Sequence, residues 1–245
     1  MRWQDKAIIL GARPFGESSL IVEVMSESHG RHLGVVKGGK SRRASAVLQA
    51  GNHVTVEWWA RLDEHLGSFR VEVINYSAAQ LMQSSSALYA LELAAVHLRL
   101  LPERDPHKRL FDITKLLISH VETPLILAEL LVRLELYLLE ELGFGLDLSR
   151  CAVTGKTDNL IYVSPKSARA VSREPGEPWK DKLMVLPQFL LSNASRPQDL
   201  DSVISGFKLT GYFLDQYVWK PRAITPPSVR DGFVRELSKF YGTQV

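Results

Sequence analysis

The chain has 245 residues, of which 45% are hydrophobic and 23% are charged, and this composition excludes a disordered or fibrous protein. The net charge of +3 is small, so any basic surface for nucleic acid has to be local. The single cysteine, Cys151, excludes an internal disulfide and a cysteine-rich zinc site, and it fits a reducing cytosol. The length predicts two domains.

The first part of the chain has the pattern of short β-strands. Runs of β-branched and aromatic residues at 7–10, 20–24, 32–36, 54–59 and 69–74 are separated by glycine, proline and serine turns. Five strands are too few for a two-sheet sandwich and fit a small closed barrel. We therefore expect a five-stranded OB-fold barrel over residues 1–80.

Two adjacent tryptophans, Trp58 and Trp59, lie in the fourth of these strands. Successive side chains of a strand point to opposite faces, so at most one of the two can fill the barrel. The other has to lie outside, either packed against a helical domain or exposed as a stacking platform for bases.

Past Ser84, apolar residues recur with the period of a helix. Ser84, Asp105 and Thr123 are placed to cap three helices, and prolines at the first helical position follow the last two caps. The third helix would end at Gly143, where glycine can take the left-handed conformation. Leucines surround this helix almost completely, which predicts the central member of a bundle.

Residues 150–187 interrupt the helical pattern with glycines and prolines, and they predict an irregular or β-hairpin insertion around residues 160–163. Helices resume over residues 197–219 and 228–240. The expected fold class is therefore α+β, in which the barrel is followed by an α-helical bundle domain over residues 81–245.

No signal peptide or membrane span is expected. The start of the chain lacks the apolar core of a signal peptide. The most apolar stretch, residues 124–142, contains five charged residues and is too polar for hydrocarbon. We expect a cytoplasmic protein that does not contact a membrane.

Asp and Glu are absent from residues 28–56, and this is the most informative feature for function. The basic residues of the stretch are Arg31, Lys37, Lys40, Arg42 and Arg43. Residues 38–43 predict a flexible linker between strands, so the cations would project from a loop. Cations without competing carboxylates neutralise phosphates and release counterions, as binding to a nucleic-acid backbone requires. We therefore expect the OB-fold domain over residues 1–80 to be a nucleic-acid-binding domain. The alternative is a solvated turn.

No arrangement of residues predicts a catalytic centre or a metal site. Residues 155–157 resemble the end of a phosphate-binding loop, but Arg150 stands where that loop needs its first glycine. His29 and His32 lack the helical frame or the cysteine partners of zinc sites. We therefore expect no covalent catalysis and no cofactor.

Two blocks of sequence carry a resemblance to a known family. The first is Arg-Pro-Phe-Gly-Glu-Ser-Ser-Leu over residues 13–20, followed by the basic residues up to Arg43. The second runs over residues 133–145, from Arg-Leu-Glu-Leu-Tyr to Leu-Gly-Phe-Gly, and is followed by Cys151. In order and spacing these blocks resemble the RecO family of bacterial DNA repair and recombination mediators.

The resemblance implies an OB-fold domain, a helical domain and an inserted element that is a four-cysteine zinc finger in some members. Cys151 stands at the position of the first ligand, but Thr154 replaces its partner and no later cysteine exists. One thiolate cannot hold zinc. We therefore expect a degenerate, zinc-less finger-like insertion over residues 150–187.

The resemblance also implies partners. RecO proteins bind single- and double-stranded DNA, anneal complementary strands coated with single-strand-binding protein (SSB) and, with RecR, assist RecA loading. Carried onto this chain, Lys37, Arg42 and Arg43 would contact the DNA backbone, with Arg31 and Lys40 as local support. The expected location is the cytoplasm, in association with the nucleoid.

Arg133 corresponds to the family arginine associated with docking the acidic, hydrophobic tail of SSB. A guanidinium can clamp a carboxylate with two hydrogen bonds while neighbouring leucines receive an aromatic side chain. The alternative for Arg133 is a helix-surface ion pair with Glu129 or Glu140.

Two other functions are compatible with the residues. One is an RNA-binding OB-fold module in translation or ribosome assembly, which competition between RNA and single-stranded DNA would distinguish. The other is an enzyme with an overlooked metal site, which a magnesium-dependent cleavage assay would test.

Overall fold

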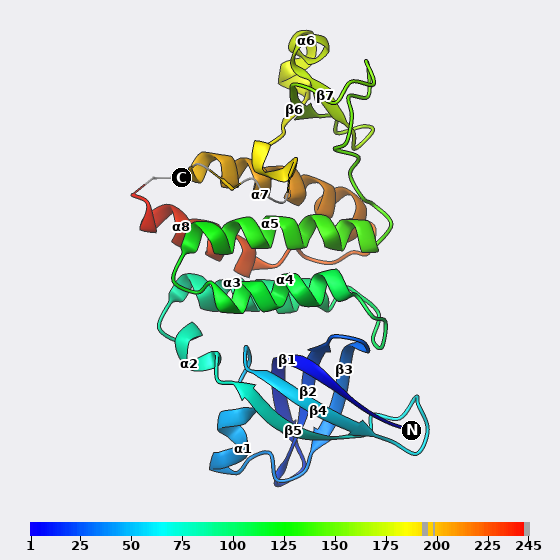
Figure 1. Ribbon diagram of the computed structural model, residues 1–245, viewed down its shortest axis with the longest axis vertical. Helices are drawn as coiled ribbons and strands as arrows, with labels where there is room; N and C mark the ends of the chain where they lie inside the picture. Colours follow the sequence, from blue (N-terminus) through cyan, green and yellow to red (C-terminus); the bar gives the residue numbers. More distant parts are fainter. Residues whose placement is uncertain (193–195, 198, 243–245) are drawn as a thin grey trace. The chain divides into compact units, whose positions relative to one another are not determined.

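The computed structural model describes residues 1–192, 196–197 and 199–242. The chain divides into two compact units, Met1–Glu122 and Thr123–Val245. Figure 1 shows the elements in chain order, from the strands at the N-terminus to the helices. The first helices after the strands belong to the same compact unit as the strands.

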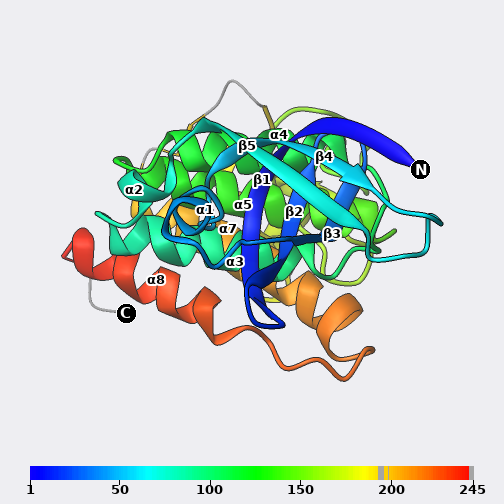
Figure 2. The ribbon, with the colours of Figure 1, turned by 90° about the horizontal axis from the view of Figure 1, so that it is seen from below.

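Five strands form a closed barrel in the first unit, seen from below in Figure 2. The order around the barrel is β1-β2-β3-β5-β4, and β1 closes it by pairing with both β2 and β4. The strands are β1 (Arg2–Phe15), β2 (Ser19–Ser26), β3 (Gly30–Val36), β4 (His53–Trp59) and β5 (Ser68–Asn75). The predicted OB-fold barrel is confirmed.

The first strand is much longer than the predicted segment 7–10. Residues 2–8 of β1 pair with β4, and residues 7–15 pair with β2. The register shifts between Ile9 and Gly11, which lets one strand bend between two neighbours. The sequence reveals only the middle of β1 because only residues 7–10 are buried on both faces.

An indole fills part of the barrel interior. Trp58 is 1% exposed, and its Nε1 donates a hydrogen bond to the carbonyl oxygen of Leu66 at 3.1 Å. Gly67 makes room for the ring, since a Cβ added there would lie 2.3 Å from Nε1 of Trp58. Trp59 is 42% exposed. The prediction that only one of the adjacent tryptophans is inside is confirmed.

The segment 38–43, predicted as a flexible linker, is a turn that leads into a short helix, α1 (Arg42–Val47), whose first two residues are Arg42 and Arg43. Ser41 caps it by accepting a hydrogen bond from the amide of Ala44 at 3.3 Å. Ala44, Val47 and the buried Leu48 pack against the barrel core. The apolar face is too short to stand out in the sequence, although it is sufficient to hold the helix on the barrel.

Three helices complete the first unit, namely α2 (Ala78–Leu81), α3 (Ser85–Leu98) and α4 (Lys108–Ser119). Ser84 caps α3 as predicted, accepting a hydrogen bond from the amide of Ala87 at 3.3 Å. The N-cap of α4 is His107, and the predicted cap at Asp105 is wrong. The backbone of Asp105 packs against Gly30, where a Cβ would lie 1.9 Å from the Asp105 carbonyl oxygen. Contact with β3 therefore delays the start of α4.

The second unit is built on the helix α5 (Pro124–Glu141). Thr123 occupies its N-cap position, and Gly143 follows its end with φ +87°, as the sequence predicted. Buried residues occur on most sides of α5, which contacts both α7 and α8. Within the described ranges, no helix, α5 included, is long and apolar enough to cross a membrane.

Two late helices pack on α5. They are α7 (Leu200–Leu214), which continues as the π-helical turn η3 (Asp215–Trp219), and α8 (Ser228–Phe240). Asp199 caps α7 by accepting a hydrogen bond from the amide of Ser202 at 2.8 Å. The helix therefore begins at Leu200 rather than at the predicted residue 197, and residue 198 lies outside the described residues.

The segment between α5 and α7 folds as a small sheet with short helical turns. The strands β6 (Leu160–Val163), β7 (Ala170–Ser172) and β8 (Met184–Val185) pair in the order β7-β6-β8. Between the last two strands lie α6 (Arg173–Gly176) and η1 (Glu177–Lys182), and η2 (Gln188–Leu190) follows β8. The predicted hairpin around residues 160–163 is confirmed.

Candidate nucleic-acid interface

The basic segment begins in a tight turn at the end of β3. Lys37 is exposed directly after the last strand residue, and Gly38 follows with φ +68°. The amide of Ser41 donates to the carbonyl of Gly38 at 3.1 Å, which closes the turn. A Cβ at Gly39 would lie 3.1 Å from Leu20, so the turn packs closely on the barrel. Lys37 therefore projects from a defined turn.

Lys40 joins this turn to the turn between β1 and β2. Its amide donates to the carbonyl of Ser18 at 3.1 Å, and its ammonium donates to the carbonyl of Gly16 at 2.8 Å. The two turns therefore lie side by side. Arg13 and Phe15 flank the β1–β2 turn, and both side chains are exposed, Phe15 at 48%. Neither residue is among the DNA contacts predicted from the sequence.

Arg42 and Arg43 form the first turn of α1, and both are exposed. The opposite face of α1 packs into the barrel, so the arginines point to solvent. No acidic residue lies in the first turn of this helix. Cations at a helix N-terminus oppose the helix dipole, so this placement does not serve the stability of the helix.

The segment formed by Lys37, Lys40, Arg42 and Arg43, together with Arg13, is called the basic edge below. In the described part of the chain, neither Lys37, Arg42 nor Arg43 forms an ion pair. Glu17, exposed in the β1–β2 turn, lies four positions after Arg13. The basic edge thus presents cations that an external polyanion can neutralise.

Arg31 is placed differently from the other predicted cations. Its side chain is 13% exposed and forms ion pairs with Glu23 at 3.0 Å and with Glu103 at 3.5 Å. It also donates to the carbonyl of Leu101 at 3.4 Å, and Arg99 pairs with the same Glu23 at 2.8 Å. Arg31 therefore connects β2 and β3 to the segment after α3 and is not part of the basic edge.

Arg133 lies inside the second unit. Its side chain is 9% exposed, and its Nε donates to Glu129 at 2.8 Å. Its Nη2 donates to the carbonyls of Phe189 at 2.6 Å and Ser192 at 3.1 Å. Arg196, which is 62% exposed, pairs with the same Glu129 oxygen at 3.2 Å. The ion pair with Glu129 that the spacing suggested is present, but it is buried rather than on the surface.

Cys151 sits in the insertion as a buried thiol. The turn after it is closed by the amide of Gly155, which donates to the Cys151 carbonyl at 2.9 Å. The amide of Ser172 donates to Sγ at 3.2 Å. Burial would raise the pKa of the thiol, but hydrogen bonds from Thr154 and Ser172 outweigh it and lower the pKa to about 6. Thr154, at the position of the missing ligand, therefore supplies a hydrogen bond instead.

No group of three or more His, Cys, Asp or Glu side chains that could hold a metal ion occurs among the described residues. Absence of zinc from the insertion remains a prediction from the sequence, to be tested by elemental analysis of the purified protein.

The barrel order and the helical unit with its small inserted sheet define an OB-fold protein with a helical C-terminal region. The family description "Recombination protein O N terminal" matches residues 1–77, and "Recombination protein O C terminal" matches residues 79–223. The chain belongs to the RecO family, a family of DNA repair and recombination proteins.

Proteins named DNA repair protein RecO are similar along their whole length. The one from Bartonella tribocorum is 56% identical over 244 residues, covering 100% of this chain and 98% of the relative. The one from Brucella abortus is 55% identical over 239 residues, covering 98% and 97%. The one from Bartonella henselae is 57% identical over 244 residues, covering 100% and 95%. These comparisons bear out the family that the two sequence blocks suggested.

Proposed function

We propose that this protein is a mediator of DNA repair and recombination that binds single- and double-stranded DNA along the basic edge of its barrel. The observation that carries the proposal is the set of exposed cations at Lys37, Arg42 and Arg43, in a stretch of 29 residues without Asp or Glu. Membership of the RecO family supports a role in DNA repair.

The contacts would go to the sugar-phosphate backbone. Lysine and arginine on turns neutralise phosphates without reading base edges, so binding would be independent of sequence. Two strands held on one basic surface repel each other less, which would allow complementary strands to anneal. This mode of action needs no covalent catalysis and no cofactor.

Charge reversal tests the proposal. The full-length chain with Lys37, Arg42 and Arg43 all changed to Glu should lose strand annealing and most of its affinity for DNA, because phosphates would meet carboxylates instead of cations. A matched control reverses three exposed cations of the second unit and changes the net charge equally: Lys208, Arg235 and Lys239.

Far-ultraviolet circular dichroism should show both variants folded, since none of the six side chains is buried. Unchanged annealing by the first variant at physiological salt would refute the proposal. Tighter binding of RNA than of single-stranded DNA would favour an RNA-binding module instead.

We also propose the family partners SSB and RecR, with RecA acting downstream, and a cytoplasmic, nucleoid-associated location. For the SSB tail, the buried ion pair of Arg133 with Glu129 supports an indirect role of Arg133. In this role Arg133 holds Glu129 in place, and the more exposed Arg196, which pairs with the same Glu129, contacts the acidic tail. Titration of a labelled tail peptide by fluorescence anisotropy would compare Arg196→Ala with Lys208→Ala. Equal binding by both variants would refute the role of Arg196.

A further inference from the structure

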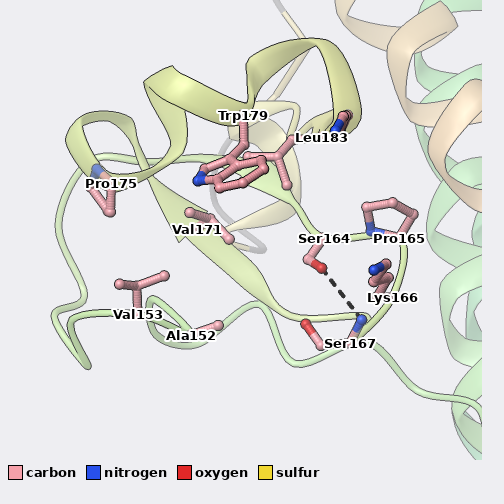
Figure 3. Close-up of a pocket in the computed structure, with 11 residues that line it drawn as sticks. Ala152, Val153, Ser164, Pro165, Lys166, Ser167, Val171, Pro175, Trp179 and Leu183 are labelled. Atoms are coloured by element: carbon pink, nitrogen blue, oxygen red, sulfur yellow. Dashed lines mark hydrogen bonds between the residues drawn. The ribbon is translucent and has the colours of Figure 1, made fainter.

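A hollow of about 500 Å³ lies in the insertion of the second unit. Figure 3 shows the residues that line it, which come from the turn after Cys151, the turn between β6 and β7, the strand β7, the short helix α6 and the helical turn η1 with Leu183 after it. A volume of this size is within the range of about 300 to 1,000 Å³ typical of small-molecule sites. The apolar walls are Ala152, Val153, Pro165, Val171, Pro175, Trp179 and Leu183.

Trp179 is the most unusual of these walls. It is 57% exposed, although an indole gains more from burial than most side chains. Figure 3 shows its ring reaching from η1 over Val171. The ammonium of Lys182 lies 5.5 Å from the ring centroid, a cation–π contact that helps to fix the ring. The result is an oriented, accessible aromatic face beside a hollow.

The charge of the lining is positive. Lys166 and Lys182 are its charged residues, and none of the lining residues is a carboxylate. The nearby Glu177 is engaged by the ammonium of Lys180 at 3.0 Å and by the hydroxyl of Tyr162 at 3.3 Å. The lining therefore favours a planar apolar group that carries a negative charge next to it.

Two serine hydroxyl groups of the lining can hydrogen-bond to the edge of such a ring. Ser164 and Ser167 lie in the turn between β6 and β7, where Oγ of Ser164 accepts a hydrogen bond from the amide of Ser167 at 3.4 Å. A hydroxyl that accepts one bond keeps its own proton to donate. The carbonyl and ring-nitrogen acceptors of a nucleobase match this donor.

We propose that the hollow holds one nucleobase of a single-stranded nucleic acid, stacked on Trp179, with the adjacent phosphates neutralised by Lys166 and Lys182. A nucleotide combines a planar ring with an anionic group one sugar away, which is the combination that the lining selects. Stacking on an indole accepts any base. The hollow lies in the second unit and would be a contact point separate from the basic edge, so this inference goes beyond the proposed function.

The first test measures affinity of the full-length chain for a fluorescein-labelled oligothymidylate. Trp179→Ala should weaken binding by roughly tenfold, the order expected for loss of one base–aromatic stack, whereas Trp179→Phe should retain most of the affinity. Phe240 on α8 is 64% exposed and provides the control, so Phe240→Ala should bind like the unaltered chain. Equal affinity of Trp179→Ala and Phe240→Ala overturns the inference.

The second test locates the contacts by photo-crosslinking with an oligonucleotide that contains 5-iodo-deoxyuridine, followed by mass spectrometry of the peptides. Crosslinks at Trp179 should appear in the unaltered chain and persist when Lys37, Arg42 and Arg43 are reversed. Crosslinks confined to the barrel overturn this inference and leave the proposed function standing. Crosslinks at Trp179 with none in the barrel support this inference and count against the proposed function. A third outcome is that no crosslink forms at Trp179 while an acidic peptide with an aromatic residue binds in a way that depends on Trp179. This outcome assigns the hollow to a peptide and overturns the inference.

Discussion

The carboxylate of Glu135 on α5 accepts two hydrogen bonds from the guanidinium of Arg230 on α8, at 2.8 and 3.0 Å. Glu135 is fully buried and also accepts a hydrogen bond from Thr210 on α7. Arg230 lies 5.1 Å from the ring centroid of Phe207 and donates to the carbonyl of that residue at 2.6 Å. Burial alone would lower the pKa of Arg230, but the charge of Glu135 raises it, so the guanidinium keeps its charge. One ion pair thus connects three helices.

Arg230→Ala should destabilise the second unit by about 3 to 5 kcal/mol, because it leaves a buried carboxylate without its counter-charge. Urea unfolding followed by circular dichroism measures the change in the free energy of unfolding. Arg235→Ala, at an exposed position of the same helix, is the control and should change it by less than about 0.5 kcal/mol. Replacement of both partners, Glu135→Leu with Arg230→Met, should restore much of the lost free energy of unfolding. If the double variant is no more stable than Arg230→Ala, the uncompensated charge is not the cause.

Gly67→Ala should destabilise the barrel, because the new methyl group would lie 2.3 Å from Nε1 of Trp58. The matched control is Gly16→Ala. Gly16 has φ +61° and Gly67 has φ +67°, so both substitutions carry similar backbone strain, but a Cβ at Gly16 meets nothing within 4 Å. We expect Gly67→Ala to cost about 1 to 3 kcal/mol more than Gly16→Ala, as overpacking does. Similar unfolding midpoints in urea would show that the indole moves aside freely.

Acidification should weaken the barrel through His32. Burial, with smaller contributions from Arg104 and His29, lowers the pKa of His32 from 6.5 to about 4. Below pH 6.5 the unfolded chain therefore binds a proton that the folded chain excludes, so stability falls as the pH drops from 6.5 to 4. The loss is on the order of 3 kcal/mol. Burial also lowers the pKa of His53, which acts in the same direction.

The comparison of His32→Phe with the unaltered chain isolates this contribution. His32 makes edge-on contacts with Trp3 and Trp58, which a phenyl ring can also make. The free energy of unfolding of the variant should therefore depend less steeply on pH between 6.5 and 4. An unchanged slope would assign the acid sensitivity to other groups.

Lys37→Ala and Arg31→Ala should separate DNA contact from structural support. Removal of one phosphate contact lowers the slope of log affinity against log salt by about 1, so Lys37→Ala should show this change without loss of stability. Arg31→Ala should instead lower stability by about 1 to 3 kcal/mol, because Glu23 and the Leu101 carbonyl lose a donor. Salt titrations of DNA binding and urea unfolding measure the two effects. If Arg31→Ala also lowers the slope of log affinity against log salt, Arg31 contacts DNA as well.

The fold was largely predictable because its signals are local. Strand alternation, the cap at Ser84 and the glycine at Gly143 act within a few residues of the elements they define. The errors arose where contacts between residues far apart in the sequence determine where a helix begins. Backbone packing of Asp105 on Gly30 moves the start of α4 to Lys108, and packing of Val47 on the barrel core holds a helix whose first two residues, 42 and 43, were predicted as linker.

The site was predictable only in part, for the same reason. The absence of carboxylates marks the basic segment in the sequence, but it does not reveal which cations face inward. Arg31 is neutralised by Glu23 on the neighbouring strand and by Glu103, 72 positions further along the chain, and Arg133 binds the carbonyl of Phe189 from another element. Arg13 joins the basic edge only because Lys40 holds the two turns together, although it stands in the block that resembles the family.

The placement of two positive charges at the start of α1 has a consequence for dynamics. Each arginine repels the helix dipole by roughly 0.3 to 1 kcal/mol, and an anion bound to Arg42 and Arg43 would relieve this repulsion. Ligand and helix would then stabilise each other. Amide protons of residues 44–48 should accordingly exchange with deuterium more slowly once a polyanion is bound, making α1 a built-in reporter of occupancy.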